Sequence, residues 1–263
     1  MSAYYNEHDP GKAAWLRELI KARVIAPGEV DERDIEDVRP NDVIGFTQCH
    51  WFAGTGAWSY ALRRAGWSDD RPVWTASCPC QPFAAPGEGT GFADERHLWP
   101  AFFHLIEERA PVVIFGEQVE DAIKYKWLDL IQSDMEGIGY SFAAPVLPAA
   151  CVGAPQIRQR IYWVADAAEA GRRERCSHAG GVVERDPAER YATGSVSGGH
   201  VNGWWRNAEW IGCLDGKHRP IEPGTGALAH EPPARILRLR GYGDGIVAEL
   251  AAEVIRAYMA ITD

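Results

Sequence analysis

Short apolar runs alternate with amphipathic segments along most of the chain. Strands are predicted where β-branched and aromatic residues cluster, at residues 3–9, 43–52, 72–76, 111–115, 140–147 and 161–165. Apolar residues at helical spacing predict helices over residues 10–24, 57–65, 99–106, 122–131 and 246–258. Strands that alternate with helices form parallel sheets with helices on both faces. We therefore expect an α/β fold with a doubly wound, mostly parallel sheet.

The first predicted helix opens at Pro10, which suits the first turn of a helix. Pro27 and Gly28 are expected to stop it. Its apolar face is predicted to consist of Ala13, Leu16, Leu19, Ile20 and Val24.

The periodicity is lost between residues 166 and 233, which are rich in glycine, arginine and tryptophan. We interpret this segment as a small irregular insert domain. The catalytic and cofactor-binding domain is then expected to span residues 1–165 and to be completed by residues 234–263.

Composition adds limits on the class of protein. The net charge of -10 argues against a nucleic-acid partner, although arginines in the second half, such as those at positions 158, 160, 172, 173, 175, 206, 235, 238 and 240, would allow a local basic cleft. Six cysteines at irregular spacing make no disulfide framework. No signal peptide or membrane span is visible, so we expect a cytoplasmic protein without a membrane partner.

Cys80 is the first candidate for a catalytic residue. Cys80 follows the predicted strand 72–76 in a proline-pinned turn, and the glycine-rich run 86–91 comes after it. An exposed cysteine beside a mobile loop suits a nucleophile, whereas most cysteines only pack in the core.

Two further positions could carry chemistry. A Gly-x-Gly turn, Gly54-Thr55-Gly56, links a predicted strand to a helix and could approach a cofactor, although this pattern alone is weak. Glu117 follows the predicted strand 111–115, where open α/β sheets place their sites.

Several motifs carry a resemblance to one family. The run Pro79-Cys80-Gln81-Pro82-Phe83, followed by the glycine-rich loop and residues 94–98, resembles the catalytic loop of DNA cytosine-5 methyltransferases. Residues 52–57, 117–119, 156–160 and 241–245 resemble further motifs of that family. Ala57, Gln118 and Asp244 depart from the usual glycine, asparagine and asparagine.

This resemblance implies the fold of S-adenosylmethionine-dependent methyltransferases and a catalytic set. Cys80 would add to C6 of a cytosine flipped out of DNA, and Glu117 would hold a proton at N3. Arg160 would hold the base O2, and Arg158 would brace the Cys80 loop. Alternation along the predicted strand would point Gln156, Arg158 and Arg160 to one side.

The resemblance also implies an S-adenosylmethionine site with a permuted order of motifs. The ribose- and adenine-binding motifs resemble residues 6–10 and 31–35, which precede the glycine turn. Glu7 would accept from the ribose hydroxyls, His8 would stack near adenine, and Asp34 and Ile35 would meet the adenine edge. The full implied set of cofactor contacts is Glu7, His8, Asp34, Ile35, Phe52, Gly54, Thr55, Gly56, Pro79 and Leu98.

Double-stranded DNA is the implied partner of what is expected to be a monomer. Gln81, Gln156 and Arg206 are the implied DNA contacts, and the insert would read flanking base pairs. Cys176, His178, Cys213 and His218 fit no standard zinc spacing, so no metal is expected. Two alternatives remain: the same thiol chemistry with a folate-type one-carbon donor, and a non-catalytic DNA-binding protein.

Overall fold

The computed structural model describes residues 2–79, 98–154, 158–167, 209–212, 218–221 and 245–262. The main sheet consists of β1 (Ala3–Asn6), β2 (Gly28–Asp31), β3 (Gln48–Trp51), β4 (Val73–Ala76), β5 (Val113–Val119), β6 (Ser141–Ala143), β7 (Val146–Pro148) and β8 (Gln159–Asp166). The helices are α1 (Pro10–Lys21), α2 (Ala57–Ala65), α3 (Trp99–Arg109), α4 (Trp127–Gly137) and α6 (Ala248–Thr262).

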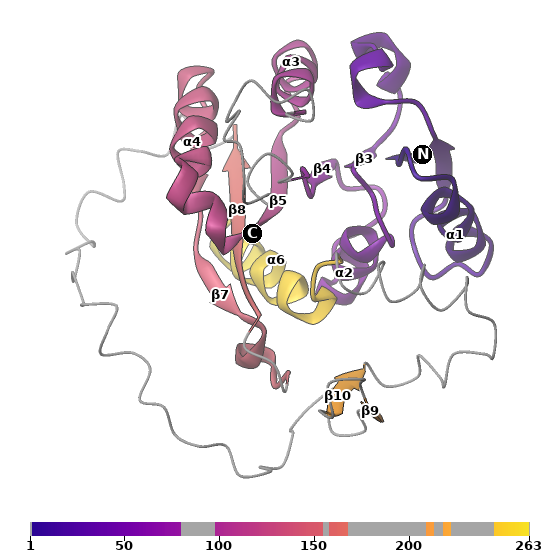
Figure 1. Ribbon diagram of the computed structural model, residues 1–263. Helices are drawn as coiled ribbons and strands as arrows, with labels where there is room; N and C mark the ends of the chain where they lie inside the picture. The colour runs from indigo at the N-terminus through magenta and orange to yellow at the C-terminus, as the bar shows by residue number, and fades with distance from the viewer. Residues whose placement is uncertain are drawn as a thin grey trace, which may run out of the picture.

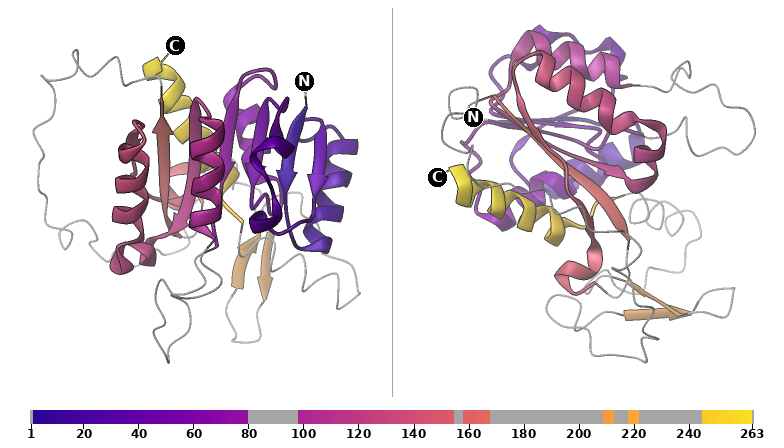
Figure 2. Two further views of the ribbon diagram at one scale, coloured as in Figure 1. Left: turned by 90° about the horizontal axis from the view of Figure 1, so that it is seen from above. Right: turned by 90° about the vertical axis from the view of Figure 1, so that its left-hand side faces the viewer.

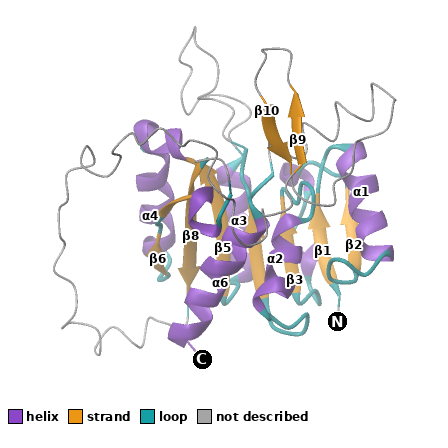
Figure 3. Cartoon of the chain, turned by 90° about the horizontal axis from the view of Figure 1, so that it is seen from below, coloured by secondary structure: helices purple, strands orange, loops and turns teal. Residues whose placement is uncertain are grey.

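The strands lie in the order β2-β1-β3-β4-β5-β8-β6, and β7 also pairs with β8. Figure 3 shows this sheet from β2 at one edge to β6 at the other. All neighbours from β2 to β5 are parallel, and β8 runs antiparallel to β5. The carboxyl ends of β1 to β5 and the amino end of β8 therefore meet at one edge of the sheet. The expected mostly parallel sheet is confirmed, and the N-terminal β1-α1-β2 unit forms its edge beside β3.

Helices cover both faces of this sheet, as the doubly wound prediction requires. α3 and α4 lie on one side, and α1, α2 and α6 lie on the other (Figure 1; the right-hand view of Figure 2). α2 and α6 pack against each other over the middle of the sheet.

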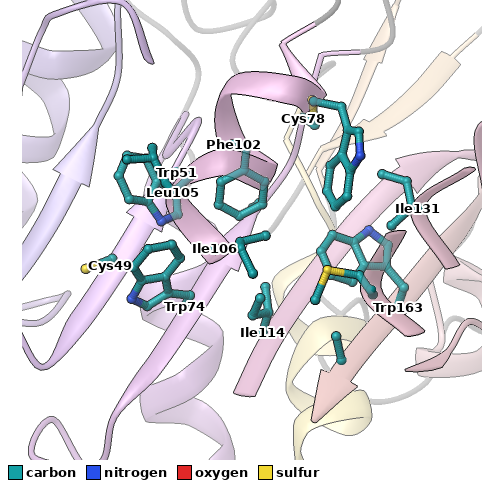
Figure 4. Close-up of a cluster of buried hydrophobic side chains, with 14 of the residues drawn as sticks. Cys49, Trp51, Trp74, Cys78, Phe102, Leu105, Ile106, Ile114, Ile131 and Trp163 are labelled. Carbon is teal, nitrogen blue, oxygen red and sulfur yellow. The ribbon is translucent and has the colours of Figure 1, made fainter. Parts of the chain in front are cut away.

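The face under α3 and α4 holds a core rich in tryptophan. Trp51, Trp74 and Phe102 have ring centroids 5.1 to 6.2 Å apart, and all lie in one buried cluster with Trp163 (Figure 4). This cluster joins strands from β3 to β8, so it fixes the relative positions of the strand ends that bear candidate site residues.

The opposite face has a core of its own beneath α1. Leu16 of α1 packs in a buried cluster with Ala3, Tyr5 and Ile25. The hydroxyl of Tyr5 donates to the carbonyl of Ala26 at 2.7 Å and lies 3.0 Å from that of Ser59 on α2. The N-terminal unit is thus held to the rest of the sheet by backbone pairing, apolar burial and buried hydrogen bonds.

Several predicted boundaries were wrong. α1 ends at Lys21, so Val24 lies beyond the helix and is exposed. The strand predicted over residues 43–52 is only β3, because Pro40 leads into a 3₁₀ turn, Pro40–Val43. The helix predicted over residues 122–131 is a 3₁₀ segment, Glu120–Tyr125, followed by α4, and residues 140–147 form β6 and β7 rather than one strand.

Within the predicted insert the structure describes two short strands. β9 (Glu209–Gly212) and β10 (His218–Ile221) pair antiparallel as a separate sheet. The domain boundaries proposed from the sequence stay a prediction. Among the described helices, none combines the length and the hydropathy that spanning a lipid bilayer would take.

Candidate active site

The glycine turn follows β3 at the edge where the parallel strands end. Phe52 and Gly54 take positive φ values of 52° and 56°, a conformation that disfavours side chains with a Cβ. Among the described residues, a Cβ at Gly54 would meet only the Phe52 carbonyl oxygen, at 3.7 Å, which leaves room for a ligand to approach this backbone. Gly56 also serves packing, because a Cβ there would lie 3.1 Å from Leu16 of α1.

Glu7 lies against this turn although 47 residues separate it from Gly54 in the chain. The Gly54 amide donates to Glu7 Oε2 at 2.7 Å, and the Asp9 amide donates to Oε1 at 3.0 Å. Each carboxylate oxygen has a second lone pair, so the group can still accept hydrogen bonds from a diol. The donor and acceptor set at this strand end therefore fits a ribose.

The other residues of the predicted nucleoside site lie at the same edge. His8 is exposed, and Asp34 caps the 3₁₀ turn Ile35–Asp37 by accepting from the Glu36 amide at 3.2 Å. Ile35 is buried in the core, 3% exposed, with little of its side chain open to a ligand. Thr55 is partly buried in the glycine turn.

β4 leads directly toward the predicted nucleophile. Cys78 is buried, Pro79 is exposed, and Leu98, which is partly buried, is the N-cap residue of α3. The Gln118 side-chain amide donates to the Cys78 carbonyl at 3.1 Å, and its oxygen accepts from the Val119 amide at 2.9 Å. The glutamine that departs from the family motif thus ties β5 to the backbone two residues before Cys80.

Glu117 and Arg160 form an ion pair at this edge. Glu117 lies within β5 rather than at its end and is 6% exposed. Arg160 Nε lies 3.0 Å from Glu117 Oε1. Burial raises the pKa of Glu117 to about 6, against the opposing effects of Arg160 and Arg158. A carboxyl group with this pKa can hold or release a proton near neutral pH.

Arg158 differs from its predicted placement. Strand alternation was expected to align it with Arg160, but β8 begins at Gln159 and Arg158 has φ +32°. The Arg158 guanidinium donates to the carbonyl of Gly245, next to α6. The positive charge still influences Glu117, because both arginines lower its pKa. A turn, rather than the alternation of a strand, brings Arg158 to this site.

Cys80, Gln81, Gln156 and Arg206 lie outside the described residues, as do the cysteines and His178 of the rejected zinc pattern.

Two side chains near Glu117 carried no sequence signal of their own. Ser77 follows β4, and Trp58 on α2 donates its indole N–H to Ser77 Oγ at 3.1 Å. Only the pairing of β4 with β5 reveals that Ser77 comes beside Glu117.

Comparison with known proteins gives a family match over the middle of the chain. Residues 67–178 match the model of the C-5 cytosine-specific DNA methylases. This segment contains Cys80, Glu117, Arg158 and Arg160.

Curated relatives match over similar spans. The type II methyltransferase M.HhaI of Haemophilus parahaemolyticus is 34% identical over 99 residues, which are 36% of this chain and 30% of that protein. M.AluI of Cellulosimicrobium cellulans is 32% identical over 108 residues, covering 37% of this chain and 21% of that protein. The chain thus matches less than a third of the length of either relative.

Solved structures also resemble the chain. The Dnmt2 methyltransferase of S. pombe aligns over 63% of this chain and 51% of that one, with 15% identity and a TM-score of 0.40. A putative DNA modification methyltransferase from an E. coli prophage aligns over 65% of this chain and 48% of that one, with 16% identity and a TM-score of 0.41. Residues 67–178 are thus similar to the C-5 cytosine-specific DNA methylases, both by the family model and by the curated relatives.

Proposed function

We propose that the protein transfers a methyl group from S-adenosylmethionine to C5 of a cytosine in double-stranded DNA. The observation that carries this proposal is the ion pair of buried Glu117 with partly buried Arg160, beside the strand that leads to Cys80. A carboxyl group and a cation at the sheet edge, together with a thiol that follows β4 closely in the sequence, suit addition to a pyrimidine ring.

Cytosine C5 is too weak a nucleophile to attack a methyl sulfonium directly. In the proposed reaction the Cys80 thiolate bonds to C6, and the electron pair of the C5–C6 double bond becomes available at C5. C5 then takes the methyl group from the sulfonium, which leaves as the neutral thioether. Loss of the C5 proton to a base and departure of Cys80 from C6 restore the aromatic ring.

Glu117 would hold a proton at N3 of the base, so that the ring does not accumulate negative charge during thiolate addition. Its burial favours the protonated acid when a base displaces the remaining water. Arg160 would reach the O2 of the same base from its place beside Glu117, and Arg158 would brace the thiol loop and favour the thiolate by its charge.

S-adenosylmethionine, when bound, supplies an activated methyl group. Support for its site comes from the contact of Glu7 with the Gly54 amide and from the few contacts that described residues would make with a Cβ at Gly54. Glu7 would accept from the ribose hydroxyls, while His8, Asp34 and Ile35 would lie around the adenine. Phe52, Thr55, Gly56, Pro79 and Leu98 complete the proposed contacts.

The target cytosine would leave the duplex to reach the site, because ring atoms are inaccessible within the base stack. Gln81, Gln156 and Arg206 would contact DNA, and residues 166–233 would read the flanking base pairs. The protein would act as a monomer in this reaction, which sedimentation of the DNA complex can test.

The activity test incubates the purified protein with S-adenosylmethionine and duplex DNA and measures 5-methylcytosine by mass spectrometry. The wild-type protein and C151S, which changes an exposed cysteine, are expected to form it. C80S is expected to form none. Methylation by C80S would reject Cys80 as the nucleophile.

Two further measurements separate the alternatives. Calorimetric titration with S-adenosylhomocysteine is expected to give heat that is lost in E7Q and kept in E29Q, an exposed acid on β2. No heat in the wild-type protein would favour a folate-type donor. DNA that contains 5-fluorocytosine should trap a covalent complex, and its absence together with DNA binding would favour a non-catalytic protein.

A further inference from the structure

A hydrogen-bond chain leads from the helix layer into the Glu117 site. Trp58 on α2 is 4% exposed, and its indole N–H donates to Ser77 Oγ at 3.1 Å. Ser77 follows β4 directly. β4 and β5 pair in parallel with Ala76 opposite Gly116, so the next residues along, Ser77 and Glu117, lie side by side.

The direction of this chain follows from the chemistry of its groups. An indole N–H can only donate, so Ser77 Oγ accepts from Trp58 and keeps its own proton for another acceptor. The Ser77 hydroxyl lies close enough to the Glu117 carboxylate to lower the pKa of Glu117 by donating to it. An ionised carboxylate can only accept. The chain therefore runs from Trp58 through Ser77 to Glu117.

We propose that Ser77, oriented by Trp58, is a positioning residue that holds the Glu117 carboxylate and adjusts the pH at which it binds its proton. The hydroxyl acts on the ionised form, because donation to a carboxylate stabilises its charge. Removing it should leave Glu117 protonated up to a higher pH. Its consequence for turnover rests on the proposed function, whereas the titration of Glu117 does not.

In the described part of the chain, the polar groups around Glu117 come from β8 with the turn before it, and from the residue that follows β4. From β8 and the turn before it come Arg160, at 3.0 Å, and Arg158. Tyr162 pairs with Glu117 across β5 and β8, and burial keeps the pKa of its phenol above the usual range. Ser77 alone among these groups is neutral at every pH, so its removal changes no net charge.

The test follows the Glu117 carboxyl band by infrared difference spectroscopy in the ligand-free protein as the pH is changed. The band is assigned by its absence in E117Q. S77A is expected to raise the midpoint by roughly one pH unit, as loss of one hydrogen bond to a charged group implies. S77T, which keeps a hydroxyl on the same carbon, is expected to retain the wild-type midpoint if the fold is kept. W58F should raise it by a smaller amount.

W67F is the matched control for W58F. Trp67 lies in the same buried cluster, and its indole donates to the Arg71 carbonyl rather than to the site. W67F should keep the wild-type midpoint. An unshifted or lowered midpoint in S77A would overturn the proposal, and equal midpoints in W58F and W67F would overturn the part assigned to Trp58.

Turnover gives a second readout. If protonated Glu117 is needed at N3, the rate falls as pH rises through its pKa, and S77A should move this fall to higher pH. A rate lowered equally at every pH would indicate a merely structural role for Ser77. Absence of methyl transfer in the wild-type protein would reject the proposed function and leave the titration result intact.

Discussion

At the scale of single residues, burial disfavours the charged form of the Glu117 carboxyl group. Burial raises its pKa from 4.5 to about 6 despite two arginines nearby. The folded protein therefore binds a proton more tightly than the unfolded chain between these values. Its contribution to the free energy of unfolding is greatest below pH 4.5 and falls by about 2 kcal/mol as pH rises through 6.

We predict that E117Q removes this fall. Denaturant unfolding between pH 4 and pH 7 should show E117Q gaining about 2 kcal/mol on the wild-type protein across the interval. E107Q, on the exposed face of α3, is the control and should follow the wild-type curve. Parallel curves for E117Q and the wild-type protein would contradict the raised pKa.

His50 has the opposite effect on stability. Its ring is 1% exposed, stacks on Tyr5 at a centroid distance of 4.8 Å, and places Nδ1 2.8 Å from Thr75 Oγ1. Burial lowers its pKa to about 3. The unfolded chain therefore binds the proton first, and the contribution of neutral His50 is complete above pH 6.5 and is lost as pH falls toward 3.

H50Q should remove this dependence on pH. In the wild-type protein, His50 is expected to lower the free energy of unfolding by about 1.4 kcal/mol for each pH unit below 6.5. In H50Q the free energy of unfolding should depend less on pH, by the same amount for each unit. H104Q changes an exposed histidine on α3 and should keep the wild-type slope. Between pH 4.5 and 6 the effects of His50 and Glu117 oppose each other, so single variants are needed to see either.

At the scale of elements, the pairing of β5 with β8 depends on a close approach at Gly116. Gly116 pairs with Trp163, and a Cβ there would come 1.9 Å from the indole ring. Trp163 is buried among other aromatic rings and has little room to move. The absence of a side chain at Gly116 thus allows the Trp163 indole to pack against β5 one residue before Glu117.

G116A should therefore destabilise the protein by about 1 to 3 kcal/mol, as overpacking of a core does. G137A is the control, because a Cβ at Gly137 in α4 would meet no atom of the described part of the chain within 4 Å. It should be neutral or slightly stabilising, since alanine favours a helix. The measurement is the free energy of unfolding in denaturant, and equal values for the two variants would contradict the role of Trp163.

At the scale of the whole molecule, the N-terminal unit is held by contacts that do not depend on its place in the chain. β1 pairs with β3, Leu16 packs at Gly56, and Glu7 accepts from Gly54. We predict that a chain with residues 2–45 moved into the turn between α2 and β4, through flexible linkers, forms the same sheet and titrates S-adenosylhomocysteine as the wild-type protein does.

The control moves the same residues into the turn between α4 and β6, at the opposite edge of the sheet. That chain should bind no S-adenosylhomocysteine, because Glu7 would lie far from Gly54. Circular dichroism and thermal unfolding report whether each chain folds. Failure of the first chain to fold would show that chain order, and not only the contacts, is needed for this sheet.

Much of the element order was predictable because burial leaves a periodic pattern. The apolar runs at β4 and β5 and the helical spacing of α2 are local, and each was found near its place. Boundaries were wrong where tertiary contacts or turn chemistry decide, as at Pro40 and before β8. Val24 has the right residue type for a helix face, but the backbone had already turned at Arg23, with φ 59°.

The sequence by itself determined the alternation of strands and helices, the similarity of residues 67–178 to C-5 cytosine-specific DNA methylases and the residue types available for chemistry, since these depend on local composition and spacing. Only the tertiary structure decided that Glu7 lies on the Gly54 amide, that Arg158 turns toward Gly245, and that Trp58 reaches Ser77. These contacts join residues that are distant in the chain, and they form because a twisted sheet brings the ends of its strands to one edge. Contacts between residues that are distant in the chain leave no pattern in the local sequence.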